Sequence, residues 1–148
     1  MTQDEFIKVL KKKGYSYELE GDNIVVTHEG DVNLESLKSL PPGVEFKNGG
    51  GVDLESLTSI PPGVEFRNEG GVDLESLTSL PTGVEFSNGG SVALNSLTSL
   101  PTGVEFRNKG DVWLDSLIGG HFSDWKGNIE GIDSKRLLNL MIKQGVFI

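Results

Sequence analysis

A pattern that returns every twenty residues constrains this chain more than any other feature of its sequence. The pattern first covers Leu34–Phe46, as Leu-Glu-Ser-Leu-Lys-Ser-Leu-Pro-Pro-Gly-Val-Glu-Phe. It restarts without any insertion at Leu54, Leu74 and Leu94, and a partial fifth copy covers Leu114–Leu117. A fixed period of this length is typical of a solenoid, in which each copy forms one coil and stacks on the next.

Each copy carries apolar residues at the same six phases. In the first copy these phases are Val32, Leu34, Leu37, Leu40, Val44 and Phe46. Burying six apolar side chains releases less free energy than ordering twenty residues consumes, so one copy cannot fold alone. Neighbouring copies must therefore share their apolar faces.

Inside a copy, apolar and polar residues alternate with a period of two. Val44–Lys47 and Val52–Glu55 both alternate in this way, which predicts strands with one buried face. The segments Pro41–Gly43 and Gly49–Gly51 are turn signals, and they leave no room for a helix. We therefore predict an all-β fold, a parallel β-solenoid of about five coils stacked about 4.8 Å apart. Each coil has two short strands, and the segment that holds Leu37 and Leu40 forms an irregular third side.

The repeat pattern is absent from the two terminal segments of the chain. Both segments are predicted to cap the solenoid, which covers residues 30–117, and the whole chain is predicted to form a single structural domain. Residues 1–29 form a helix-and-hairpin cap, in which Thr2 and Glu5 make a capping box and the helix runs to about Lys13 before Gly14. The hairpin's second strand is in phase with the repeat, because Ile24 precedes Val44 by twenty residues. Such a cap protects the open edge of a sheet from aggregation.

Residues 118–148 form the C-terminal cap. His121–Gly131 is predicted to be a closing loop or a last strand. A helix then begins at a cap residue, Asp133 or Ser134, and reaches about Gln144. The apolar tripeptide Val146–Ile148 is expected to pack against the last coil.

The Ser-Leu-Thr-Ser-Leu-Pro segments, the twenty-residue length and the column of asparagines (Asn48, Asn68, Asn88 and Asn108) resemble the short leucine-rich repeats of secreted bacterial effectors. This resemblance covers residues 30–117 and implies a leucine-rich-repeat-like solenoid. The order Leu40, Val44, Phe46, Asn48, Val52 departs from the leucine-rich-repeat spacing. That departure favours a straighter solenoid with two strands per coil. We expect the asparagines to bind backbone groups of the turns.

The charge of the chain is concentrated in the repeats. The net charge is −9, and residues 30–117 carry 13 acidic and five basic residues. Direct binding to nucleic acid is not expected, because it needs a basic surface. The chain has no cysteine, no apolar run as long as a membrane span and no signal-peptide core, so we expect a cytoplasmic protein without membrane contact.

The sequence contains no recognisable catalytic motif. His28 and His121 lie at opposite ends of the repeats, and neither has the spacing of a metal ligand. The glycines at Gly49–Gly51 occur between predicted strands and are interpreted as turns, not as a phosphate-binding loop. We therefore expect a protein that is not an enzyme and has no cofactor or metal.

The outward-facing columns of the two predicted strands differ in charge. In the first strand, a column of glutamates that begins at Glu45 lies beside a partly basic column that begins at Lys47, so we expect this face to neutralise itself. In the second strand, the columns that begin at Asn33 and Glu35 contain no basic residue. The candidate partner-binding residues on this strand are Asp53, Glu55, Asp73, Glu75, Trp113 and Asp115.

Three interpretations of the carboxylates of Asp53, Glu55, Asp73 and Glu75 remain open at this point. They keep the protein soluble, they dock a basic protein, or they hold Ca²⁺. Trp113 is either an exposed contact residue for a partner or packs under the C-terminal cap.

The leading functional hypothesis is a non-enzymatic acidic repeat protein that binds a protein partner. The near-identical copies suggest recent duplication, as in small proteins of phages or mobile elements. In that setting the protein would act as an inhibitor of a nucleic-acid-binding protein. The alternatives are a structural spacer, or a small-molecule binder at an edge pocket near Trp113, His121 and Trp125.

Overall fold

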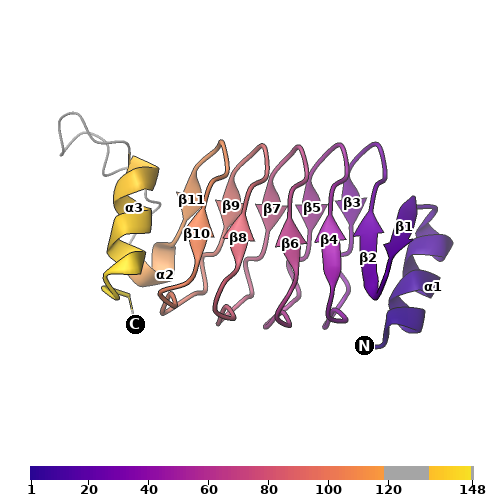
Figure 1. The fold of residues 1–148 in the computed structure, drawn as a ribbon, viewed down its shortest axis with the longest axis horizontal. Coiled ribbons are helices and arrows are strands. Elements are labelled where there is room, and N and C mark those ends of the chain that lie inside the picture. The colour runs from indigo at the N-terminus through magenta and orange to yellow at the C-terminus, as the bar shows by residue number, and fades with distance from the viewer. Residues whose placement is uncertain (119–133, 148) are drawn as a thin grey trace.

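The computed structural model describes residues 1–118 and 134–147, and it confirms the parallel β-solenoid with a short helix at each end (Figure 1). The coils stack in a straight row, and the chain makes about four turns with a spacing of twenty residues. The partial fifth copy adds only the strand β11 (Val112–Trp113) and the short helix α2 (Asp115–Ile118).

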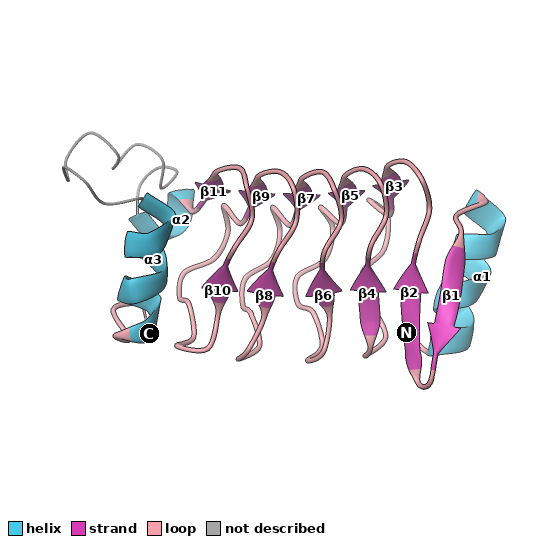
Figure 2. Ribbon diagram, turned by 45° about the horizontal axis from the view of Figure 1, so that its top comes forward, coloured by secondary structure: helices cyan, strands magenta, loops and turns pink. Residues whose placement is uncertain are grey.

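Each coil contributes one strand to each of two sheets, which we call sheet A and sheet B (Figure 2). Sheet A contains, in spatial order, β1 (Tyr17–Glu20), β2 (Asn23–Val26), β4 (Val44–Phe46), β6 (Glu65–Phe66), β8 (Glu85–Phe86) and β10 (Glu105–Phe106). Sheet B contains β11, β9 (Val92–Ala93), β7 (Val72–Asp73), β5 (Val52–Asp53) and β3 (Val32–Asn33). All neighbouring strands are parallel except β1, which pairs antiparallel with β2.

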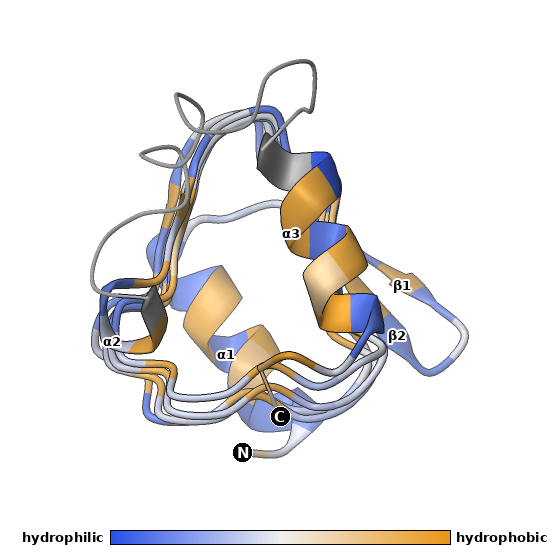
Figure 3. Cartoon of the chain, turned by 90° about the vertical axis from the view of Figure 1, so that its left-hand side faces the viewer, coloured by the Kyte–Doolittle hydropathy of each residue, from blue (hydrophilic) through white to orange (hydrophobic). Residues whose placement is uncertain are grey.

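Identical residues of successive coils lie directly beside one another. Phe46 pairs with Phe66 in sheet A, and Val52 pairs with Val72 in sheet B. The phenylalanine rings are buried and stacked, with centroids 5.2–5.5 Å apart and planes within 5–8° of parallel. Viewed along the axis, the coils superpose in a rounded triangle, whose third side is irregular as predicted (Figure 3). The six apolar columns fill the interior of this triangle.

A ladder of buried asparagines holds the turns between the two sheets. The side-chain nitrogen of Asn68 donates to the carbonyl oxygens of Gly50, Gly70 and Gly71 at 3.0–3.1 Å. The same three-way contact recurs at Asn48, Asn88 and Asn108. The prediction that the asparagines bind turn backbone is therefore confirmed.

The close stacking of these turns explains one invariant glycine in each copy. A Cβ atom at Gly70 would lie 2.6 Å from the backbone nitrogen of Gly51, which is closer than any real Cβ contact. Gly50, Gly90 and Gly110 are equally confined. At Gly51 a Cβ would meet nothing within 3.4 Å, and the equivalent position in a later copy is Ser91.

The N-terminal cap has the predicted form. Helix α1 (Gln3–Lys13) begins at Thr2, whose side chain accepts a hydrogen bond from the backbone of Glu5, and ends at Gly14 with φ of 73°. The hairpin places β2 beside β4 in the predicted register. At the open edge of sheet B, the hydroxyl of Tyr15 accepts a hydrogen bond from the backbone N–H of Asn33 at 3.0 Å. The Tyr15 hydroxyl thus takes the place of a neighbouring strand.

The C-terminal cap uses the same device on the other sheet. Helix α3 (Ser134–Lys143) ends one residue before the predicted Gln144 and buries Leu138 and Ile142 against the last coil. The side-chain amide of Asn139 accepts a hydrogen bond from the N–H of Phe106 and donates one to its carbonyl, both at 2.7 Å. These are the two groups of β10 that would face a further coil, so Asn139 replaces one peptide of that coil.

The final apolar tripeptide packs only in part. The carbonyl of Phe147 accepts a hydrogen bond from the N–H of Leu100 at 2.9 Å, and its side chain is partly buried on the core. The prediction is wrong for Val146, which belongs to the turn after α3 and is exposed. Ile148, the closing segment His121–Gly131 and the alternative cap residue Asp133 lie outside the described residues. No helix in the described ranges is long and apolar enough to cross a bilayer.

Candidate functional site

The outer face of sheet A carries paired charges. Glu45 contacts Lys47 at 3.4 Å and Arg67 of the next coil at 3.7 Å. Arg107 contacts Glu105 at 2.9 Å and Glu85 at 3.7 Å. These glutamates stack with parallel register, so the basic column beside them offsets their mutual repulsion. The prediction that this face neutralises itself is confirmed.

The outer face of sheet B carries carboxylates that have no such partners in the part of the chain that the structure describes. Asp53 and Asp73 are directly paired between β5 and β7, and Glu55 follows β5 on the same side. One carboxylate oxygen from each of Asp53, Glu55 and Asp73 lies within 4.8 Å of the other two. Within the described ranges, these three residues and Glu75 take part in no ion pair.

The repulsion within this cluster shifts two pKa values. The neighbouring charge of Asp53 raises the pKa of the exposed Glu55 above its ordinary value, and the charges of Asp73, Glu35 and Glu75 add to the effect. Burial raises the pKa of Asp73, with further contributions from Glu75 and Asp53, although a backbone hydrogen bond from Glu75 opposes the shift. Both shifts mean that the folded chain holds these negative charges at an energetic disadvantage.

Two of the carboxylates also hold the backbone that follows their strands. Asp53 accepts a hydrogen bond from the N–H of Glu55, and Asp73 accepts one from the N–H of Glu75, each at 3.1 Å. Asn33 makes the same contact in the first coil, at 3.0 Å, with an uncharged side chain. The same turn forms with the uncharged Asn33 and with Ala93, which has no side-chain acceptor, so it does not require a charge, and the negative charge needs a separate explanation.

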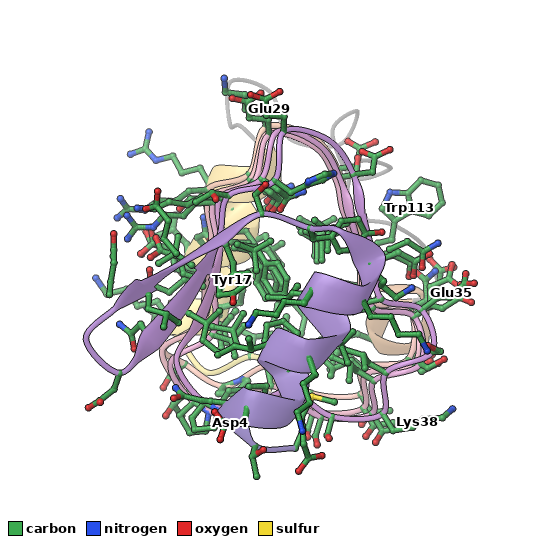
Figure 4. The ribbon with its side chains drawn as sticks, turned by 90° about the vertical axis from the view of Figure 1, so that its right-hand side faces the viewer. Asp4, Tyr17, Glu29, Glu35, Lys38 and Trp113 are labelled. Carbon is green, nitrogen blue, oxygen red and sulfur yellow. The ribbon has the colours of Figure 1, made fainter. Side chains whose placement is uncertain are left out.

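A groove of about 500 Å³ runs along this face, across the strands of sheet B. Small residues from successive coils line it, namely Gly51, Gly71, Ser91 and Ala93. Asp31 lines it in the first coil, Asp53 and Asp73 line it in β5 and β7, and Trp113 lines it in the last coil. Figure 4 shows that Trp113 and Glu35 lie on the same side of the molecule, opposite the β1–β2 hairpin.

The six predicted partner-binding residues therefore separate into two groups. The structure brings together Asp53, Glu55 and Asp73, of which the two aspartates line the groove, and Trp113 lines the same groove with 39% of its surface exposed. Glu75 is exposed beside the groove without lining it, and Asp115 lies at the start of α2. Both interpretations of Trp113, as a contact residue for a partner and as a residue packed under the C-terminal cap, stay predictions.

The carboxylate cluster supplies only part of a metal site. Ca²⁺ takes six to eight oxygen ligands, whereas three side chains converge here. Asp53 and Asp73 each already use one oxygen to accept a backbone N–H. The cluster is therefore best described as an anionic surface.

Two features were not predicted from the sequence. One is the row of small residues that forms the floor of the groove, and the other is a cavity between β10 and helix α3 at the C-terminal end. The floor was visible as a column of small residues at the phase of Gly51, Gly71 and Ser91. The predicted edge pocket near Trp113, His121 and Trp125 lies in part outside the described residues, since these do not include His121 and Trp125. Comparisons with protein-family models, with curated proteins and with solved structures find no match for this chain.

Proposed function

We propose that this chain is a non-enzymatic binding module whose acidic groove on sheet B holds an extended, basic segment of a partner protein. The observation that carries this proposal is the contrast between the two faces. Carboxylates on sheet A are paired with Lys47, Arg67 and Arg107, whereas those on sheet B converge without a counter-charge among the described residues.

A basic partner would remove the repulsion that the folded chain sustains. Lysine or arginine side chains placed between Asp53, Glu55 and Asp73 would supply the counter-charge that sheet A supplies internally. Clustered charge of one sign also accelerates encounter with a partner of the opposite sign. The surface is therefore suited to recruitment of a basic segment rather than to solubility alone.

The shape of the groove favours an extended segment. It is lined from Asn33 in β3 to Trp113 in β11, a distance of four coil spacings or about 19 Å. An extended chain covers about 3.3 Å per residue, so about six residues fit. Gly51 and Gly71 allow close approach of the bound backbone, and Trp113 lines the far end of the groove in the last coil.

The partner can be specified further as a hypothesis. Proteins that bind nucleic acid present basic segments to phosphate groups. A row of carboxylates on sheet B would compete for such a segment, so the module would act as an inhibitor of a nucleic-acid-binding protein. Competition between this chain and DNA for one basic peptide would distinguish that role from a simple docking function.

The direct test measures fluorescence anisotropy of a labelled six-residue Lys/Arg peptide. We expect saturable binding that weakens with salt and falls at least tenfold in the variant D53N/E55Q/D73N/E75Q. The matched control is E45Q/E65Q/E85Q/E105Q, which removes the same number of charges from sheet A and should retain binding. Equal losses in both variants would show that only net charge matters, and no binding by the wild type would favour the spacer hypothesis.

A further inference from the structure

A second cavity, of about 710 Å³, lies between β10 of the last coil and helix α3. Figure 1 shows α3 standing beside β10 at the C-terminal end of the solenoid. This cavity is lined by sheet A residues and is distinct from the groove on sheet B. Its size is in the range of sites that bind small molecules.

The two hydrogen bonds from Asn139 to Phe106 fix which side of α3 faces the cavity. Residues three before and four after Asn139 lie on the same helical face, and the residue that follows Asn139 is a neighbour of both, four after the first and three before the second. These residues are Arg136, Leu140 and Lys143, and all three line the cavity. The opposite side of α3 buries Leu138 and Ile142 in the core.

The cavity is cationic in a chain whose net charge is −9. Three basic residues line it, and the one acidic residue among the described lining residues is Glu105. Glu105 is already bound to Arg107, whose pKa it raises. Arg136 and Lys143 take part in no ion pair within the described ranges. Their positive charges are therefore available to a ligand.

The order of residues along α3 specifies the shape of that ligand. Arg136 and Lys143 are seven residues apart, which corresponds to about 10 Å along a helix. Leu140 lies between them, and 49% of its surface is exposed. The cavity thus presents a positive group, an apolar surface and a second positive group in a row.

We propose that this cavity binds an elongated organic dianion. One anionic group contacts Arg136, the other contacts Lys143, and the hydrocarbon between them covers Leu140. Arginine and lysine form charge-assisted hydrogen bonds to carboxylate oxygens, and contact with the hydrocarbon removes apolar surface of Leu140 from water.

The test uses three probes and the full-length chain in isothermal titration calorimetry. Azelate carries two carboxylates whose extended separation is about 10 Å, matching the rise between Arg136 and Lys143. Succinate carries two carboxylates too close together, and nonanoate has the chain length of azelate with one carboxylate. We expect azelate to bind at least tenfold more tightly than either. Equal affinity for succinate or nonanoate would overturn the two-ended arrangement.

Substitutions of the two basic residues on α3 test whether azelate binds in this cavity. Arg136→Gln and Lys143→Gln should each weaken azelate binding severalfold, and the double variant should bring azelate to the affinity of nonanoate or below. Lys38→Gln removes a positive charge from the irregular third side and should leave binding within twofold of the wild type. An unchanged affinity in the double variant, with an unchanged melting curve, would place the ligand elsewhere and refute the proposal.

Discussion

Asn68 is a buried residue whose side-chain nitrogen holds three carbonyl groups from two adjacent coils. Replacing it with alanine leaves these carbonyls without their donor, and we expect a loss of about 2–4 kcal/mol in the free energy of unfolding. Asn68→Asp should cost at least as much, since it places an oxygen against three carbonyl oxygens. Urea unfolding curves measure both, with Lys38→Gln on the irregular third side as an exposed control. If Asn68→Ala lost less free energy of unfolding than the control, water would have replaced the hydrogen bonds that the Asn68 side chain donates.

Glu55 provides a residue-scale prediction about pH. Its folded pKa is raised above the ordinary 4.5, so the folded chain binds its proton more tightly than the unfolded chain does. The wild type therefore loses stability as pH rises through this raised pKa. Glu55→Gln should raise the melting temperature at pH 7, and the difference should vanish below pH 4.5.

The matched control for this pH effect is Glu45→Gln on sheet A. Glu45 contacts Lys47 and Arg67, so its loss removes attraction instead of repulsion. Thermal unfolding at several pH values should show no gain for this variant at pH 7. Destabilisation by Glu55→Gln at pH 7 would instead indicate that the Glu55 charge is bound by something structural, such as a cation.

At the scale of elements, helix α3 stabilises the solenoid through one side chain as well as through its buried face. Asn139→Leu leaves the N–H and the carbonyl of Phe106 without partners, which should cost about 2–4 kcal/mol and promote self-association at the exposed edge. Asn139→Asp keeps the acceptor for the N–H and should be intermediate. Chemical unfolding and size-exclusion chromatography measure the two effects.

The cap at the other end supplies a comparison for this prediction. Tyr15→Phe removes the hydroxyl that accepts from Asn33, so it should cost about 1 kcal/mol without exposing the core. If Asn139→Leu were no more destabilising than Tyr15→Phe, the paired hydrogen bonds of Asn139 would not be the basis of the C-terminal cap.

At the scale of the whole molecule, the coil is the unit that can be removed. Deleting residues 54–73 joins Asp53 to Leu74, which takes the position of Leu54 and keeps every column in register. The shortened protein should remain folded, lose some stability and become about 4.8 Å shorter. Circular dichroism and small-angle scattering measure these changes.

Deleting only residues 54–63 is the control. It removes half of a coil and joins a sheet B strand directly to a sheet A strand without the third side. This chain should unfold or aggregate. Comparable folding of the two deletions would mean that the twenty-residue register does not set the structure.

Much of the fold follows from the sequence because the same physical constraints are repeated in each copy. The apolar columns predict the buried phases, the alternation predicts the two strands, and the glycine–proline turns exclude helices. The bounds of the first helix were predicted correctly from Thr2 and Gly14, because a capping residue interacts with backbone groups only a few residues away in the sequence. The charged columns of both sheets were predicted for the same reason, since parallel stacking places equivalent residues side by side.

The sequence by itself therefore determined the solenoid, its period, its core and the contrast between a paired and an unpaired charged face. Tertiary structure alone decided the features that join distant segments. Tyr15 meets Asn33, and Asn139 meets Phe106 across 33 residues, without any periodic signal. The groove and the cationic cavity likewise depend on how coils and caps are placed in space. Repetition encodes contacts between neighbouring copies, whereas the caps occur once, and their contacts arise only when the chain has folded.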